Sequence, residues 1–394
     1  MKLRSISLTT MLCCLAVISR ADGNTVASRG LTVHEGQLLL NGRPYRGIGA
    51  NYFCLFSRTL RDASDESYDD GLRNLSEARI PFVRFMACGY WPADWDLYLQ
   101  DKGEYFKRMD AVVRSAEKHG VGLIPSLFWN MATVPDLVGE PMDQLGNPKS
   151  KTIALIEQYT REVVLRFRDS PAVWGWEFGN EYNLQADLPN ASQHRPPVWP
   201  TLKTALQRTA RDELSSSAML TAFGRFAETV RKYDTQRILI TGNSIPRISA
   251  FHNSTAKSWG KDSRAQFEEV LLRDNPDPYP VLCVHVYGNS GQGETRSIYE
   301  LAAMLQEIAA RVGKPLFIGE FGAPRTMGME QEKAQFSEML DAIVTSNVAL
   351  AAFWVFDHAG QDKDWNVTFE NERRYMLELV TAANRRLQAA RSDD

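Results

Sequence analysis

The stretch Trp174-Gly175-Trp176-Glu177-Phe178-Gly179-Asn180-Glu181 is typical of a buried strand that ends in an asparagine–glutamate pair. A second stretch, Pro315-Leu316-Phe317-Ile318-Gly319-Glu320-Phe321-Gly322, repeats this design with an apolar run that ends in a glutamate. Short apolar runs bounded by turn residues fit strands that are buried on both faces, as in a parallel sheet. The two stretches therefore predict two central strands, each with a carboxylate at its end.

Further apolar strands lie on both sides of these two, and amphipathic helices separate them. The predicted strands span residues 46–51, 82–85, 121–127, 173–179, 238–241, 281–286, 316–319 and 351–356. Between them, apolar residues recur at the helical period, most clearly in two stripes: Tyr105, Met109, Val112 and Ala116, and then Ile298, Leu301, Leu305, Ile308 and Val312. Helix stops occur where expected, at Gly120 and Gly313.

Eight strand–helix units predict an α/β fold, namely a single (β/α)₈ TIM barrel spanning residues 22–394. An open doubly wound sheet is the alternative, but no glycine-rich phosphate loop follows the first strand. Residues 31–33 and 38–40 predict a short N-terminal β-hairpin, with Asn41-Gly42 as a turn signal, and we expect it to cover the bottom of the barrel. Three long loops, 183–216, 243–266 and 357–374, are expected on the C-terminal face, where barrel enzymes build their active sites.

The N-terminus has the pattern of a secretory signal peptide over residues 1–21. Its apolar part, 6–18, is too short to span a bilayer, and Ser19 and Ala21 supply the small residues of a cleavage site. A frayed amphipathic terminus is the alternative, and Cys13-Cys14 lacks a convincing lipobox for a lipoprotein. No other segment is a membrane-span candidate, so we expect a soluble, monomeric chain that is secreted or periplasmic.

Composition limits the partners of the chain. Its 394 residues suit one barrel with insertions, and its net charge of −3 gives no reason to expect a nucleic-acid partner. Three cysteines remain after cleavage: Cys54, Cys88 and Cys283. Because an odd number of cysteines cannot all pair within one chain, they do not indicate a disulfide framework. Cys283 is expected to be a buried thiol. A disulfide between Cys54 and Cys88 stays open, because they follow adjacent predicted strands.

The two strand-end glutamates, Glu181 and Glu320, end the fourth and seventh predicted strands and can face each other across the barrel rim. Hydrolysis of a glycosidic bond needs two carboxylates, one to protonate the leaving oxygen and one to attack the anomeric carbon. A capping or salt-bridge role is the alternative for either glutamate alone. The pair, with Asn180 before the first, predicts a glycoside hydrolase with a carbohydrate substrate.

With these motifs in this order, the sequence resembles family 5 of the glycoside hydrolases, the cellulase/β-mannanase family, in the clan of retaining (β/α)₈ glycosidases. The resemblance implies a double displacement on a β-1,4-linked polysaccharide or oligosaccharide, with Glu181 as acid/base and Glu320 as nucleophile. It implies that Asn180 contacts the sugar 2-hydroxyl. It also implies four further site residues: Arg84 to keep the nucleophile ionised, His285 beside the acid/base, Tyr287 to donate to the nucleophile, and Trp354 beneath the sugar of the −1 subsite.

One position departs from the family pattern. The family usually has a histidine near the end of strand three, where this chain reads Pro125-Ser126-Leu127-Phe128-Trp129-Asn130. We expect Trp129 or Asn130 to take over that substrate contact. The first strand, residues 47–53, looks more like that of β-mannanases than that of many cellulases, which favours β-mannan as substrate, with β-glucan next.

Three alternatives compete with this hypothesis. Another retaining member of the clan, such as a xylanase or an exo-β-glycosidase, shares the catalytic logic and is the main one. A non-catalytic sugar-binding barrel is disfavoured because both carboxylates are present. A metallohydrolase is disfavoured because the six histidines show no His-x-His or His-x₃-His spacing, so we expect neither a metal nor another cofactor.

Overall fold

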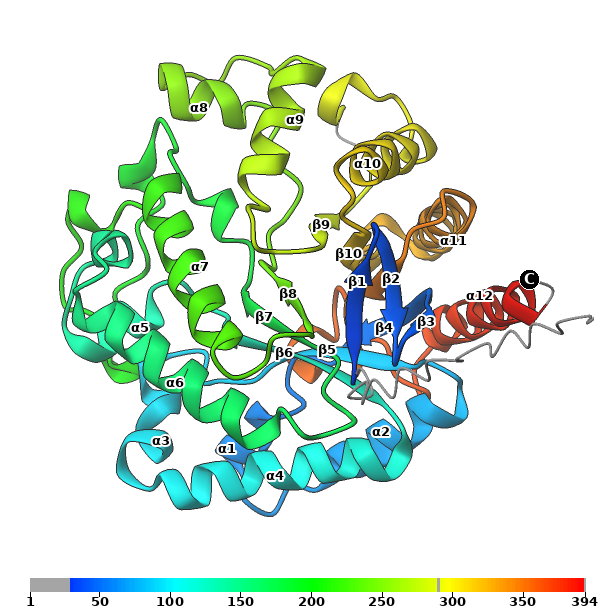
Figure 1. The fold of residues 1–394 in the computed structure, drawn as a ribbon, viewed down its shortest axis with the longest axis horizontal. Helices are drawn as coiled ribbons and strands as arrows, with labels where there is room; N and C mark the ends of the chain where they lie inside the picture. The colour runs from blue at the N-terminus through cyan, green and yellow to red at the C-terminus, as the bar shows by residue number, and fades with distance from the viewer. Residues whose placement is uncertain (1–28, 289–290, 393–394) are drawn as a thin grey trace, which may run out of the picture.

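Eight parallel strands form the centre of the molecule, and helices surround them (Figure 1). The computed structural model describes residues 29–288 and 291–392, so the predicted signal peptide at 1–21 lies outside the described residues. The strands are β4 (Gly47–Asn51), β5 (Phe82–Met86), β6 (Gly122–Phe128), β7 (Gly175–Gly179), β8 (Ile238–Ile240), β9 (Leu282–Val286), β10 (Leu316–Phe321) and β11 (Leu350–Phe353). The predicted (β/α)₈ barrel is confirmed, and each predicted strand is present.

The helices cover the outside of the barrel. They are α1 (Ser57–Arg61), α2 (Ser67–Glu77), α3 (Asp96–Gln100), α4 (Lys102–His119), α5 (Thr133–Val138), α6 (Lys151–Phe167), α7 (Ser216–Arg231), α8 (Ala250–Ala256), α9 (Arg264–Arg273), α10 (Ile298–Val312), α11 (Met329–Thr345) and α12 (Arg374–Ser392). Helices α4 and α10 carry the two predicted stripes, and every stripe residue except the half-buried Val312 is buried. Both helices end at a glycine with positive φ, Gly120 at 67° and Gly313 at 68°.

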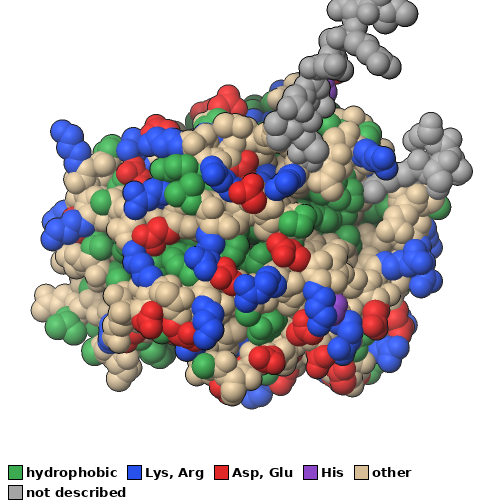
Figure 2. Space-filling model, turned by 60° about the horizontal axis from the view of Figure 1, so that its bottom comes forward, with side chains coloured by type: hydrophobic (Ala, Val, Ile, Leu, Met, Phe, Trp, Pro, Cys, Tyr) green, Lys and Arg blue, Asp and Glu red, His purple; other side chains and the backbone are tan. Residues whose placement is uncertain are grey.

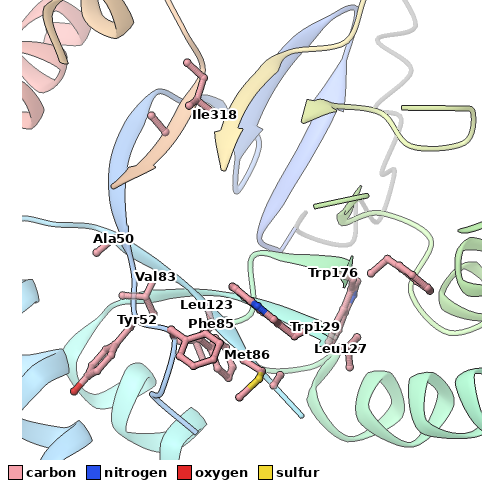
Figure 3. Packing of buried hydrophobic residues seen from close by; sticks show 14 of the residues in the cluster. Ala50, Tyr52, Val83, Phe85, Met86, Leu123, Leu127, Trp129, Trp176 and Ile318 are labelled. Atoms are coloured by element: carbon pink, nitrogen blue, oxygen red, sulfur yellow. The ribbon is translucent and has the colours of Figure 1, made fainter. Parts of the chain in front are cut away.

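Side chains alternate between the two faces of each strand, which separates two cores. Val83, Phe85 and Leu127 point outward and join the large apolar layer between strands and helices (Figure 3). Phe82 and Ile124 belong to a second cluster of strand-start residues inside the barrel. The inner positions toward the strand ends are polar instead, so the site chemistry is confined to the upper half of the barrel interior.

A small antiparallel sheet covers the bottom of the barrel, as expected for the N-terminal hairpin (Figure 1). It comprises β1 (Leu31–His34), β2 (Gln37–Leu40) and β3 (Arg43–Pro44), and Leu31 and Leu38 pack into the inner apolar cluster. Asn41 and Gly42 form the two-residue turn between β2 and β3, with φ of 51° and 78°. The third strand, β3, was not among the predicted elements.

Short 3-10 helices occupy the loops: η1 (Pro92–Trp95), η2 (Met142–Gly146), η3 (Tyr182–Leu184), η4 (Ala191–Gln193), η5 (Pro200–Leu202), η6 (Ala210–Asp212), η7 (Gln292–Glu294), η8 (Arg325–Met327) and η9 (Ala359–Gln361). Cys54, Cys88 and Cys283 are free and buried, so the possible Cys54–Cys88 disulfide is absent. In the part of the chain that the structure describes, no helix is long and apolar enough to cross a membrane. On the face in Figure 2, acidic and basic side chains are interspersed.

The barrel has one seam, between β8 and β9. Backbone pairing runs continuously from β8 through β7, β6, β5, β4, β11 and β10 to β9, and among the described residues no ladder joins the two ends. The buried side chain of Asn275 bridges this gap with hydrogen bonds to residues on both sides of it. Its Oδ1 accepts from the Cys283 N–H at 2.8 Å and the Thr241 hydroxyl at 3.1 Å, and its Nδ2 donates to the Cys283 carbonyl.

Replacing Asn275 by alanine should therefore destabilise the protein. The change leaves the N–H and carbonyl of Cys283 buried without a partner, and each such group costs about 1–3 kcal/mol. We expect the free energy of unfolding to fall by about 2–4 kcal/mol in urea titrations followed by circular dichroism. Asn147→Ala, which removes hydrogen bonds of an exposed loop, is the control and should change stability by less than about 1 kcal/mol. Equal losses in both variants would contradict this role of Asn275.

Candidate active site

The guanidinium of Arg84 lies at the centre of the site. Arg84 is on β5, is fully buried and points into the barrel. Its Nε donates to both carboxylate oxygens of Glu177, at 2.8 and 2.9 Å, and its Nη1 donates to Asn51 at 2.9 Å and to Glu320 at 2.7 Å. Its Nη2 donates to Asn180 Oδ1 at 2.8 Å. Burial opposes the charge of Arg84, but Glu177 and Glu320 outweigh it and raise its pKa.

Glu320 reaches this cation because β10 is irregular. Phe317 belongs to the inner cluster and Ile318 to the outer one, so strict alternation would point Glu320 outward. The register against β9 shifts between Ile318 and Glu320, and Glu320 then pairs with His285. A bulge of this kind re-aims a side chain. The shift brings Glu320 to the inside of the barrel, beside Arg84.

The two oxygens of Glu320 have different donors. Oε1 accepts from Arg84, and Oε2 accepts from the Tyr287 hydroxyl at 2.6 Å. Burial raises the pKa of Glu320, and the charge of Arg84 and the Tyr287 hydrogen bond act against this rise. Both donors stabilise the ionised carboxylate.

Glu181 has a strained backbone and a different environment. Its φ is 53°, in the left-handed region, and its N–H donates to the Gly242 carbonyl at 2.8 Å. Gly242 permits this approach because a Cβ there would lie 1.9 Å from the Gly179 carbonyl oxygen. Burial raises the pKa of Glu181, which favours the protonated form. One carboxylate oxygen of Glu181 and one of Glu320 lie within 4.8 Å of each other.

His285 lies between the two glutamates. Its Nδ1 is 3.0 Å from Glu181 Oε1 and 3.6 Å from Glu320 Oε1. Burial lowers the pKa of His285 to about 4, so the imidazole is neutral near pH 6. His285 on β9 and Tyr287 just after it point to the same side, as alternation predicts, and each forms a hydrogen bond with one glutamate.

A cavity of about 490 Å³ opens above the glutamates. Trp129 and Trp354 line it with ring centroids 6.0 Å apart, and the Arg84 guanidinium lies 4.5 Å from the Trp129 ring. Asn180 also lines this cavity, whereas Asn130 lines a neighbouring one and uses its Oδ1 to accept from the Ala132 N–H. The structure thus brings together every predicted site residue except Asn130: Arg84, Trp129, Asn180, Glu181, His285, Tyr287, Glu320 and Trp354.

Glu181, His285 and Glu320 are also the one group among the described residues whose ligand atoms are close enough for a metal ion. The donors of Glu320 argue against that use. Its Oε1 faces the Arg84 cation and its Oε2 accepts from Tyr287, so a metal would compete with both. The arrangement suits proton transfer and nucleophilic attack better than metal binding.

Sequence reasoning assigned no role to Glu177 and Asn51, which hold Arg84. Glu177 is fully buried and lies two and four residues before Gly179 and Glu181, so alternation along β7 places it on the inner face below them. A charged residue in the middle of an apolar strand was the available signal, because a buried carboxylate requires a cation. Asn51 gives no comparable signal, since its role depends on three carbonyls of β10 and β11 that its Nδ2 contacts.

The fold and the paired glutamates define a barrel glycosidase, and comparison with known proteins identifies the family. The chain belongs to glycosyl hydrolase family 5, because the model described as "Cellulase (glycosyl hydrolase family 5)" matches residues 43–360. The family resemblance is thereby confirmed.

Curated relatives match parts of the chain. A probable mannan endo-1,4-beta-mannosidase F from Aspergillus oryzae is 39% identical over 167 residues, which is 37% of this chain and 35% of that protein. A probable mannan endo-1,4-beta-mannosidase A-1 from Aspergillus terreus is 26% identical over 189 residues, or 43% of this chain and 46% of that one. The matches thus span less than half the length of either relative.

Solved structures match the whole barrel. The endo-1,4-beta-mannanase from Rhizomucor miehei superposes with a TM-score of 0.65 and 14% identity, covering 91% of this chain and 99% of that one. The exo-beta-1,4-mannosidase Op5Man5 from Opitutaceae bacterium strain TAV5 gives 0.59 and 15%, covering 90% and 63%. At these identities the likeness shows the fold.

The charge of Glu177 should set the pH dependence of the enzyme. Glu177→Gln removes the negative charge that offsets Arg84, so the Arg84 cation acts more strongly on Glu320 and lowers its pKa. We expect the acidic limb of the kcat/KM profile to move to lower pH by about one unit. Glu332→Gln is the matched control, because Glu332 is also buried and pairs with an arginine, Arg373, at 2.8 Å outside this network. An acidic limb that stays in place in Glu177→Gln would contradict the charge argument.

Proposed function

We propose that the protein is a retaining β-glycoside hydrolase that cleaves β-1,4-linked mannan by double displacement. The observation that carries this proposal is the separation of the two glutamates, whose nearest ligand oxygens lie within 4.8 Å. Retaining glycosidases hold their carboxyl groups about 5–5.5 Å apart, whereas inverting enzymes need about 6.5–9.5 Å to admit a water molecule. The short separation supports direct attack by one carboxylate on the sugar.

In the first step, a carboxylate oxygen of Glu320 forms a bond to the anomeric carbon while the bond from that carbon to the leaving oxygen breaks. The leaving oxygen takes the proton of Glu181. In the second step, water attacks the anomeric carbon, the bond to Glu320 breaks, and the Glu181 carboxylate takes the proton from water. Glu181 is suited to this role because burial raises its pKa and it has a neutral imidazole beside it.

Arg84 and Tyr287 support the nucleophile. Their donors face the two oxygens of Glu320 and keep it ionised when Glu181 is protonated. Asn180 is held by Arg84 through its Oδ1, which leaves its Nδ2 to face the sugar 2-hydroxyl. Trp354, whose Nε1 donates to Gln361 Oε1, would form the floor of the −1 subsite, and Trp129 would line its side in place of the usual histidine.

Mannan is the preferred substrate because the curated relatives are named as mannan endo-1,4-beta-mannosidases and the first strand resembles that of β-mannanases. β-Glucan is the second candidate, since the matching family is described as cellulase. We also propose that residues 1–21 direct export and are removed, which leaves residues 22–394 as a monomeric catalytic domain outside the cytoplasm. The sequence pattern of the N-terminus supports this part of the proposal.

Hydrolysis assays on mannan, glucomannan, cellulose and xylan test the substrate, and NMR of the first product tests the stereochemistry. We expect the highest kcat/KM on mannan or glucomannan and a β-anomer as the initial product. An α-anomer would rule out double displacement. Preference for xylan or cellulose would replace the proposed substrate and leave the mechanism standing.

Variants of the two glutamates should separate their roles. Glu181→Ala should lose about 10²–10⁴-fold in kcat/KM on unactivated β-mannosides, but little on a dinitrophenyl β-mannoside, whose leaving group needs no acid. With the dinitrophenyl substrate, added azide should replace water in the second step and give a β-mannosyl azide. Glu320→Ala is the contrasting variant, because azide would attack the sugar directly and give the α-azide. Equal losses of Glu181→Ala on both substrates would show that its acid role is wrong.

A further inference from the structure

A second cavity, of about 370 Å³, adjoins the catalytic glutamates on the other side of the barrel mouth. Its lining comes mainly from segments that follow β7, β8 and β9, whereas the first cavity is lined mostly from segments that follow β4, β5, β6 and β11. In the strand order these two groups form opposite arcs of the barrel. Tyr287 borders both cavities, and His285, which contacts Glu181, lines the second.

The position of this cavity assigns it to one side of the scissile bond. Glu181, which donates the proton to the leaving oxygen in the proposed mechanism, ends β7 and lies between the two arcs. The sugar whose anomeric carbon is attacked occupies the cavity of Trp129 and Trp354. The group that leaves must therefore extend toward the second cavity.

Arg247 gives the second cavity a distinct chemistry. It is half-buried, and its Nε donates to the Leu184 carbonyl at 2.9 Å. Among the described residues, no hydrogen bond or ion pair engages its two Nη groups. Among the described residues that line the cavity, none is an aspartate or glutamate, and with His285 neutral Arg247 is the one charged side chain. Glu181, outside that lining, interacts electrostatically with Arg247 without a hydrogen bond or ion pair.

More deeply buried arginine side chains differ from Arg247, whereas the half-buried Arg231 also donates to backbone carbonyls. Arg84, Arg208, Arg237 and Arg373 each bond a carboxylate at 2.7–2.8 Å. No carboxylate of the described residues bonds Arg247, and the planar fork of a guanidinium fits a carboxylate with two parallel hydrogen bonds. Arg247 therefore offers two donors to a ligand in the cavity. Trp259, 51% exposed in the same lining, offers a large apolar surface to a sugar ring.

We propose that the second cavity is a leaving-group subsite that selects a sugar with an acidic substituent, which Arg247 binds through its two free Nη groups. This inference rests on the proposed function and adds the chemical class of the leaving sugar. The acidic substituent is compatible with the first step, because Glu181 is then protonated and carries no charge. The bound carboxylate leaves with its sugar before Glu181 takes a proton from water.

Two trisaccharides that differ at one carbon test the proposal. Each joins β-mannobiose through a 1,4-bond to a leaving sugar, glucuronate in one and glucose in the other. The wild-type protein should hydrolyse the glucuronate compound with about tenfold higher kcat/KM, mainly through a lower KM. Arg247→Gln should abolish this preference, and Arg247→Lys should keep part of it because the charge remains without the fork.

Two controls isolate the effect. Lys261→Gln removes an exposed cation near the same loop that does not line the cavity, and it should leave the preference unchanged. β-Mannobiosyl fluoride has a leaving group too small to fill the cavity, so Lys261→Gln should hydrolyse it at the wild-type rate, and Arg247→Gln should lose less on it than on the glucuronate compound.

Three results would overturn the proposal: a wild-type preference for the glucose compound, an equal loss of Arg247→Gln on both trisaccharides, or an equal loss on the fluoride. If the wild type does not hydrolyse the fluoride, the proposed function fails instead. NMR titration with methyl β-glucuronide then decides the subsite by itself. If the wild type binds methyl β-glucuronide and Arg247→Gln does not, the subsite is supported. If the wild type does not bind it, the subsite is rejected.

Discussion

The whole site depends on one buried cation, the guanidinium of Arg84. It joins three strands that are not neighbours in the sequence, through Asn51 of β4, Glu177 of β7 and Glu320 of β10. A buried guanidinium is tolerated only when its donors are engaged, so the positions of these partners are interdependent. The same bonds that satisfy Arg84 also fix where Glu320 and Asn180 lie, and this is how the barrel positions a reactive carboxylate without relying on mobile loops.

The proposed division of labour between the glutamates follows from how charge is shared around that cation. Arg84 faces two buried carboxylates, so the negative charge of Glu177 weakens the effect of the Arg84 cation on Glu320. Glu320 thus stays basic enough to attack while Tyr287 stabilises its other oxygen. Glu181 lacks a direct bond to a cation and lies beside a neutral imidazole, so it holds a proton more easily. Two identical side chains acquire opposite roles from their surroundings.

Most of the fold could be predicted from the sequence, because strands and helices differ in the period of their apolar residues and in the residues at their ends. Every strand was located, but the eighth ends at Phe353, which leaves Trp354 beyond the ladder where its indole can turn to the cavity. The seam at Asn275 and the register shift before Glu320 could not be predicted, since both depend on backbone pairing between distant segments. Asn130 was expected in the site, but its side chain is used by the turn that follows it. Local hydrogen bonding of this kind competes with function and is invisible to pattern reasoning.

The two ends of the barrel interior obey different physical rules, and this explains why chemistry lies at one end. At the bottom, Phe82, Ile238 and Phe317 pack under the N-terminal sheet, and apolar contacts tolerate changes that conserve volume. At the top, the inward side chains are donors and acceptors with specific partners. The loss of one partner leaves the other without its hydrogen bond. The apolar bottom supplies stability that can offset the strain of Glu181 and the burial of three carboxylates and a guanidinium above it. A barrel interior that was polar throughout would lack the apolar core that holds this network in place. An interior that was apolar throughout would lack the carboxylates that react with a substrate.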